Sequence, residues 1–169
     1  MNDAPIPAAA PSAAAASPIP PGFAPHTRHS PLTDPWEPLY ARREGHAVQL
    51  GLGVREAHCN SRGFAHGGLV SALADNAMGL SAVAAARAEA ASTGQAEPPS
   101  AVTVSLSLDF IASAAIGDWL SLRPVVLRPG RTLAFVECHV WARSPAGAED
   151  LPVAEDRLVA RASATFRLG

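Results

Sequence analysis

The chain has 169 residues, of which 48% are hydrophobic and only 17% charged, and its formal net charge is -2. This length suits one domain with a sizeable core. The near balance of charge argues against the basic surface of a nucleic-acid-binding protein. All thirteen basic residues are arginines, so a phosphate group has to be held by guanidinium groups or backbone N–H groups.

Residues 1–30 consist mainly of alanine, proline and serine, with few large apolar side chains. Such a segment buries too little surface to offset its ordering entropy, so we expect a flexible tail followed by one domain over residues 31–169. The tail lacks the basic region and continuous apolar segment of a signal peptide. No apolar run approaches a transmembrane helix in length, and the two cysteines suit reduced thiols. We therefore expect a cytoplasmic protein without membrane contact.

The first half of the domain combines a hairpin with a long helix. Trp36 to Tyr40 indicates a short helix or turn that leads into a strand, and residues 46–54 alternate as a strand does. The Glu44-Gly45 pair before that strand suits a hairpin turn. From Leu69 to about residues 86–91, apolar residues recur every three or four positions and alanine fills most others, so the helix is expected to be buried.

The second half reads as antiparallel strands. A loop over 92–99 precedes strands at 102–110, 119–127, 132–143 and 158–168, with a tight turn at 128–131 and a polar loop at 144–152. Within 102–110 the even positions are apolar and the odd ones polar, which predicts one apolar face with Thr103 opposite it. No helix separates these strands, so the sheet is antiparallel. The predicted class is α+β, a curved sheet of about five to six strands wrapped around the helix.

One acidic residue, Asp75, lies within this helix, far from the nearest other acids at Glu56 and Glu89. A lone carboxylate in a buried helix needs a hydrogen-bond partner or a chemical role. Ahead of the helix, His66-Gly67-Gly68 stands where unpaired N–H groups face outward. Gly67 N–H is the best candidate to stabilise an oxyanion, with Gly68 second. Asp75 could attack a carbonyl or deprotonate water; alternatively it pairs with Arg62 or caps a loop, and the glycines merely shape the turn.

A longer pattern contains these residues: His58-x-Asn60-x-x-Gly63-x-x-His66-Gly67-Gly68, then Leu73-x-Asp75-x-Ala77-x-Gly79. It resembles the signature of hotdog-fold thioesterases of the phenylacetic-acid-degradation (PaaI) type, which the mammalian Them2-like acyl-CoA thioesterases share. The resemblance covers residues 31–169. It implies a hotdog fold, a homodimer whose sheets join edge to edge or a homotetramer, active sites at the dimer interface, and hydrolysis of acyl- or aryl-CoA thioesters without a cofactor.

The resemblance also assigns roles to further residues. Asn60 corresponds to the family asparagine that positions water or the carbonyl, although it could equally be a turn residue. His66 either orients the loop or contacts the thioester, and His58 is expected to be structural. Thr103 stands where some members have a serine or threonine that holds the water. Predicted contacts of the CoA moiety are Gly68 and the turn residues Arg128, Gly130 and Arg131, whose guanidinium groups suit phosphate oxygens.

Three alternatives remain open at this point. A hotdog acyl-CoA hydratase is less compatible with the His-Gly-Gly and Asp75 spacing than a hydrolase is. A non-catalytic acyl-CoA-binding module gains nothing from a buried charge. A metal site formed by His58, Cys59, His66 and Asp75 matches no compact zinc spacing, so no metal is expected.

Overall fold

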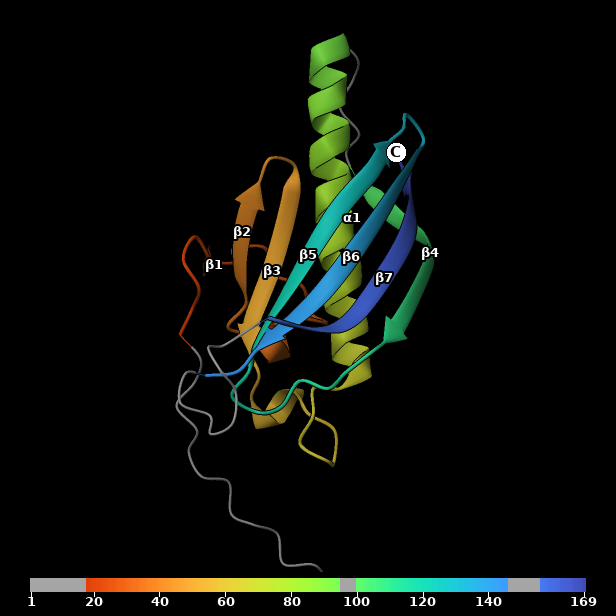
Figure 1. Ribbon diagram of the computed structural model, residues 1–169. Coiled ribbons are helices and arrows are strands. Elements are labelled where there is room, and N and C mark those ends of the chain that lie inside the picture. Colours follow the sequence, from red (N-terminus) through yellow and green to blue (C-terminus); the bar gives the residue numbers. More distant parts are fainter. Residues whose placement is uncertain (1–17, 95–99, 146–155) are drawn as a thin grey trace, which may run out of the picture.

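The computed structural model describes residues 18–94, 100–145 and 156–169. One long helix, α1 (Gly67–Thr93), lies against a seven-stranded sheet that curves around it (Figure 1). The strands are β1 (Ala24–Pro25), β2 (Tyr40–Glu44), β3 (Ala47–Gly53), β4 (Ala101–Phe110), β5 (Trp119–Pro129), β6 (Leu133–Arg143) and β7 (Arg157–Leu168). Their order is β1-β2-β3-β5-β6-β7-β4, and every neighbouring pair is antiparallel. The predicted α+β class and hotdog architecture are confirmed, with seven strands in place of five to six.

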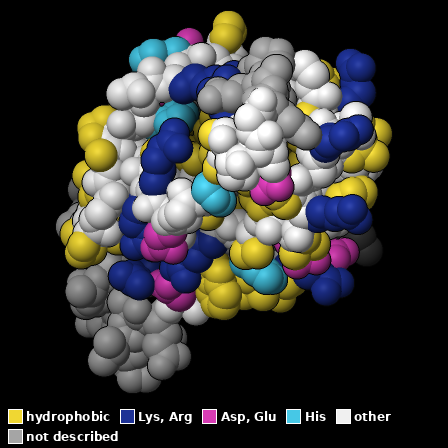
Figure 2. Space-filling view, turned by 90° about the horizontal axis from the view of Figure 1, so that it is seen from above, with side chains coloured by type: hydrophobic (Ala, Val, Ile, Leu, Met, Phe, Trp, Pro, Cys, Tyr) yellow, Lys and Arg dark blue, Asp and Glu magenta, His cyan; other side chains and the backbone are white. Residues whose placement is uncertain are grey.

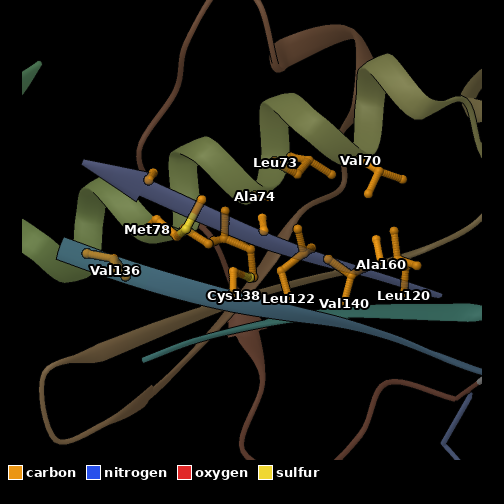
Figure 3. Packing of buried hydrophobic residues seen from close by; sticks show 14 of the residues in the cluster. Val70, Leu73, Ala74, Met78, Leu120, Leu122, Val136, Cys138, Val140 and Ala160 are labelled. Atoms are coloured by element: carbon orange, nitrogen blue, oxygen red, sulfur yellow. The ribbon is translucent and has the colours of Figure 1, made fainter. Parts of the chain in front are cut away.

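The core lies between the buried side of α1 and the concave face of the sheet. Figure 3 shows Val70, Leu73 and Met78 of the helix directed toward Leu122, Val140 and other strand residues. Val48 N–H at the start of β3 donates to Ser81 Oγ at 2.9 Å, which ties the hairpin to the helix. Cys138 is buried in this core, and burial raises the pKa of its thiol to about 12. Both cysteines are free thiols, as expected.

Only one side of α1 is buried, which corrects the expectation of a helix buried all round. Leu69, Leu73 and Ala77 face the sheet, whereas Asp75 and Leu80 lie on a half-buried opposite side. The helix α1 is long and apolar enough to cross a membrane, which corrects the expectation that no apolar segment approaches the length of a transmembrane helix. However, 56% of its most apolar window is buried inside the fold. It is the core helix of this domain.

The N-terminal segment joins the fold earlier than the composition predicts. Ala24 and Pro25 pair with Ala41 and Tyr40 of β2. The ring of Phe23 stacks edge-on against Trp119 at 5.3 Å between centroids. The expected flexible tail to residue 30 is therefore wrong for this part, because one large aromatic side chain finds a partner far along the sequence. Residues 1–17 lie outside the described residues, as do 95–99 and 146–155, which contain parts of two predicted loops.

A β-bulge in β4 decides which side chains reach the helix. The pairing with β7 shifts between Thr103 and Ser105, so Val104 is the extra residue. Thr103 is opposite Phe166 and Leu106 is opposite Ala164, and both partners belong to the core face of β7. The simple alternation predicted for 102–110 is thus wrong across the bulge, because Thr103 lies on the helix side of the sheet while Val102 points away.

Candidate active site

Asp75 and Thr103 form a direct contact between helix and sheet. Thr103 Oγ1 donates to Asp75 Oδ1 at 2.7 Å. The pair lies in a cleft of about 840 Å³ between α1, the β2–β3 hairpin and the start of β4. Asp75 is half-buried and open to this cleft, which corrects the expectation of a buried carboxylate. Its partner is Thr103 and not Arg62, which lines a different cleft.

Asn60 and Gly67 line that second cleft, of about 370 Å³, together with Phe110. Asn60 Oδ1 accepts a hydrogen bond from Arg62 N–H at 2.9 Å, so its side-chain carbonyl shapes the loop. Among the described residues the NH₂ group of the same amide has no acceptor, so it can donate to a ligand. The turn role and the ligand role of Asn60 are therefore compatible.

The loop-to-helix turn leaves Gly67 N–H available as a donor. Gly68 N–H donates to Nδ1 of His66, the N-cap residue, at 2.9 Å. Since Nδ1 accepts, we assign the ring proton of neutral His66 to Nε2. Within the described residues Gly67 N–H has no hydrogen-bond partner, as expected for the first turn of a helix. This geometry favours Gly67 over Gly68 as the oxyanion donor and makes His66 the residue that fixes the turn.

Gly67 and Asp75 cannot act on the same carbonyl within one chain. They are eight residues apart on one helix, which corresponds to about 12 Å along its axis. Both groups would have to lie about 3 Å from the reacting atoms. They also belong to different clefts. The candidate residues of a single chain are therefore divided between two clefts.

Comparison with known proteins identifies the family of this chain. A model of the thioesterase superfamily matches residues 62–148. "Putative esterase PA0474" of Pseudomonas aeruginosa is 40% identical over 152 residues, covering 89% of this chain and 97% of that protein. The chain belongs to the thioesterase superfamily. It is thus a member of a family of thioester hydrolases.

Two further similarities are consistent with this membership of the superfamily. Human acyl-coenzyme A thioesterase 13 is 33% identical over 82 residues, which cover 48% of this thioesterase and 51% of the human protein. The structure of a point mutant of the phenylacetic acid degradation protein PaaI from Thermus thermophilus has a TM-score of 0.61 at 23% identity. It covers 82% of this chain and 98% of that one, and it shows the shared fold. The predicted resemblance to PaaI-type thioesterases is confirmed.

His58 of the thioesterase is structural, as predicted. It is 1% exposed, and its Nδ1 accepts from Arg55 N–H at 3.1 Å while Nε2 contacts Trp36 O at 3.1 Å. Burial lowers the pKa of His58 below its ordinary value of 6.5, and the Arg55 charge lowers it further. The ring therefore stays neutral in the fold at a pH where the unfolded chain already binds a proton.

This shift predicts a pH dependence of stability. As the pH falls through about 6.5 toward the lower folded pKa, the unfolded state takes up the proton first, so the free energy of unfolding decreases. Urea unfolding between about pH 7.5 and about pH 5.5 should show a steeper loss in wild type than in His58→Gln. His139→Gln, at an exposed position of β6, should keep the wild-type slope. Equal slopes for wild type and His58→Gln would contradict the lowered pKa of His58. The pKa of His26 is also lowered, but His26 is present in all three proteins and so does not affect the comparison.

The turn between β5 and β6 needs its glycine for backbone reasons. Gly130 N–H donates to Leu133 O at 2.9 Å, and a Cβ at Gly130 would lie 2.5 Å from that oxygen. Arg128 and Arg131 are exposed beside it and line neither of the two clefts. Their contact with CoA, like that of Gly68, stays a prediction.

One group of possible metal ligands occurs in the described residues. His29 Nδ1 lies 3.6 Å from Asp34 Oδ1 and 3.9 Å from Glu37 Oε1. Both carboxylates already accept backbone N–H groups, from Ser30 and Leu39, so the group stabilises the loop without an ion. The alternative metal site of His58, Cys59, His66 and Asp75 is wrong, because within the described chain these residues do not bring their ligand atoms together.

The sequence patterns missed part of the Asp75 cleft. Its wall opposite α1 is formed by residues that follow β1 and by the β2–β3 hairpin, among them His26, Arg28 and Arg43. The first two lie in the segment taken for a tail, where composition hides their role. The only local feature of the sequence that could have indicated this wall is the basic character of residues 26–29, which contrasts with the alanine and proline around them.

Proposed function

We propose that this thioesterase hydrolyses acyl- or aryl-CoA thioesters at two equivalent sites, each shared between two copies of the chain. The observation that carries this proposal is the separation of the half-sites, with Asp75 and Thr103 in one cleft and Gly67 and Asn60 in another. In a two-fold symmetric dimer with antiparallel helices, an axis near Ser71, midway between residues 67 and 75, brings Gly67 of one copy opposite Asp75 of the other. The small side chains of Ser71 and Ala72 on the half-buried side allow such close approach.

The outer edge of the sheet supports the same assembly. β4 is ten residues long and forms the end of the sheet, and no described strand pairs with its second edge (Figure 1). Long open edges invite pairing with another strand. Exposed apolar side chains gather here, namely Val102, Val104, Leu106, Phe110 and Ile111. Edge-to-edge pairing of two β4 strands would cover them and give the homodimer, with a homotetramer as a further pairing of dimers.

In the proposed reaction, Gly67 N–H of one chain donates to the thioester carbonyl oxygen and stabilises the charge that develops there. Thr103 occupies Oδ1 of Asp75 in the other chain, which leaves Oδ2 for chemistry. The carboxylate either removes a proton from water, whose oxygen then bonds to the carbonyl carbon, or bonds to that carbon itself and forms an anhydride that water later cleaves. In both routes the carbon–sulfur bond breaks, and the thiolate leaves with its electron pair and takes up a proton. Asn60 NH₂ orients the water or the carbonyl.

The direct test is release of free thiol from a panel of short, long and aryl acyl-CoA thioesters by the purified full chain. We expect turnover of at least one class, with no added metal or cofactor. Enoyl-CoA hydration is measured in parallel. Hydration without thiol release would contradict the proposal and favour the hydratase, whereas binding without either reaction would favour the non-catalytic module.

A further inference from the structure

The Asp75 cleft continues well beyond the reacting groups. It follows the half-buried side of α1 past Gly79, Leu80 and Val83 to Arg87. From Asp75 to Arg87 the helix advances about 18 Å. Beyond Asn76, which adjoins Asp75, the floor as far as Arg87 is apolar and consists of Gly79, Leu80, Val83 and Ala84. The cleft is therefore long enough to hold a chain of substrate atoms that leads away from the thioester.

The wall opposite this floor is cationic. Arg28 follows β1, and Arg43 belongs to β2; His26 and His46 lie beside them. Asp75 is the only carboxylate among the residues that line the cleft. Within the described residues neither Arg28 nor Arg43 has a hydrogen bond or ion pair. The nearby Glu44 is already bound by Arg42 at 2.9 Å and by Gln49 at 2.9 Å.

Arg28 and Arg43 lie close enough to His26 to affect its protonation. Burial lowers the pKa of His26, Glu37 opposes this shift, and the charges of Arg28 and Arg43 add to the lowering. His26 Nε2 is buried and has no hydrogen-bond partner. Like charges at one place repel, and this repulsion is relieved when an anion binds among them. Figure 2 shows that arginine side chains on the face seen from above are interspersed with hydrophobic and acidic ones.

The segment that carries His26 and Arg28 is held firmly in place. Phe23 packs on Trp119, and the Arg42 guanidinium lies 5.1 Å from the centre of the Phe23 ring. His26 N–H donates to Leu39 O at 2.9 Å. Gly51 leaves the space for this packing, since a Cβ there would lie 2.5 Å from the Trp119 ring. The cationic wall is thus built into the fold.

We propose that Arg28, Arg43, His26 and His46 form an anion-binding wall that holds a negatively charged group of the substrate at a distance from the thioester. The group is a carboxylate at the far end of the acyl chain or a phosphate of CoA, since guanidinium groups bind both oxyanions in the same way. This inference rests on the proposed function only in taking Asp75 as the thioester end of the cleft. It assigns a specificity role to the segment after β1 and to the hairpin.

The test measures binding, so that it does not depend on turnover. Titration calorimetry compares thioether analogues, which cannot be hydrolysed: S-alkyl-CoA, S-carboxyalkyl-CoA of equal length, and the pantetheine counterparts that lack phosphates. The proteins are full-length wild type, Arg28→Gln and Arg43→Gln. Arg167→Gln, at an exposed position of β7 outside both clefts, is the matched control. Phe23→Ala, which loosens the segment without removing a charge, is a second variant.

Arg28→Gln and Arg43→Gln should raise the Kd of the anionic analogues about two- to fivefold, as expected for loss of one exposed charge contact. Arg167→Gln should leave every Kd unchanged, and Phe23→Ala should follow Arg28→Gln. High ionic strength should reduce the difference. The uncharged pantetheine thioether should bind all proteins alike.

The source of the anion follows from which analogues respond. An effect on carboxyalkyl-pantetheine but not on alkyl-pantetheine identifies an acyl carboxylate, and an effect on S-alkyl-CoA identifies the phosphates; both uphold the proposal. Unchanged Kd values for all analogues in Arg28→Gln and Arg43→Gln would overturn it, as would wild-type protein that binds none of them. Turnover that survives in Asp75→Asn would instead overturn the proposed function, and the calorimetry separates these two failures.

Discussion

Replacement of Asp75 by asparagine is expected to lower kcat for thioester hydrolysis by about 10²- to 10⁴-fold, the range of a lost general base. Asparagine has nearly the same shape as aspartate, and its Oδ1 still accepts from Thr103. The amide can neither remove a proton from water nor attack a carbonyl. Asp75 is half-buried at the cleft, so the substitution should leave the fold intact. Steady-state release of free thiol, with circular dichroism and the melting temperature as checks, measures this effect.

Two matched variants sharpen the result for Asp75. Glu89→Gln makes the same change of carboxylate to amide on the exposed end of α1 and should keep wild-type kcat. Thr103→Val removes the hydroxyl that orients Asp75 and should reduce kcat by about tenfold, less than loss of the carboxylate itself. Near-full turnover in Asp75→Asn would show that another group activates the nucleophile. Binding of an S-alkyl-CoA thioether with wild-type Kd would show that the variant lost chemistry and not affinity.

Local patterns in the sequence predicted the parts of the fold that depend on neighbouring residues. The spacing of apolar residues placed α1, and the Glu44-Gly45 pair placed the β2–β3 turn, because helix periodicity and turn chemistry are local properties. The glycine and histidine pattern before α1 likewise placed Gly67 at the helix N-terminus. These features need no information about distant residues.

Features that depend on distant partners were predicted less well. The bulge at Val104 changes which side chains of β4 face the helix. Alternation alone therefore placed Thr103 on the face turned away from the helix, although Thr103 contacts Asp75. Phe23 joins the fold through Trp119, and nothing near Phe23 in the sequence signals that ring. The sequence named the candidate site residues one by one, but their distribution over two clefts needed coordinates. The cationic wall was missed because His26 and Arg28 lie in a segment whose average composition resembles a linker.

The second large effect concerns Gly67, and it tests the shared site. A Cβ at Gly67 would lie 3.2 Å from Phe110 Cζ, so Gly67→Val places its side chain in the cleft between these two residues. Phe110 is 58% exposed and can shift, so the variant should fold. The added methyl groups should keep the carbonyl from Gly67 N–H and lower kcat by about 10²- to 10³-fold, as loss of one oxyanion donor does. Thiol release and the melting temperature measure activity and folding.

Mixed dimers distinguish a shared site from a site within one chain. Gly67→Val and Asp75→Asn chains, co-expressed with different affinity tags, give dimers in which one site combines the intact Gly67 of one chain with the intact Asp75 of the other. A mixed dimer should therefore recover about half of the wild-type activity, because one of its two symmetric sites is complete. Dimers that carry the same substitution in both chains remain inactive. If purified mixed dimers stay as inactive as their parents, each site lies within a single chain, and the separation of Gly67 and Asp75 along α1 must close by a change in conformation.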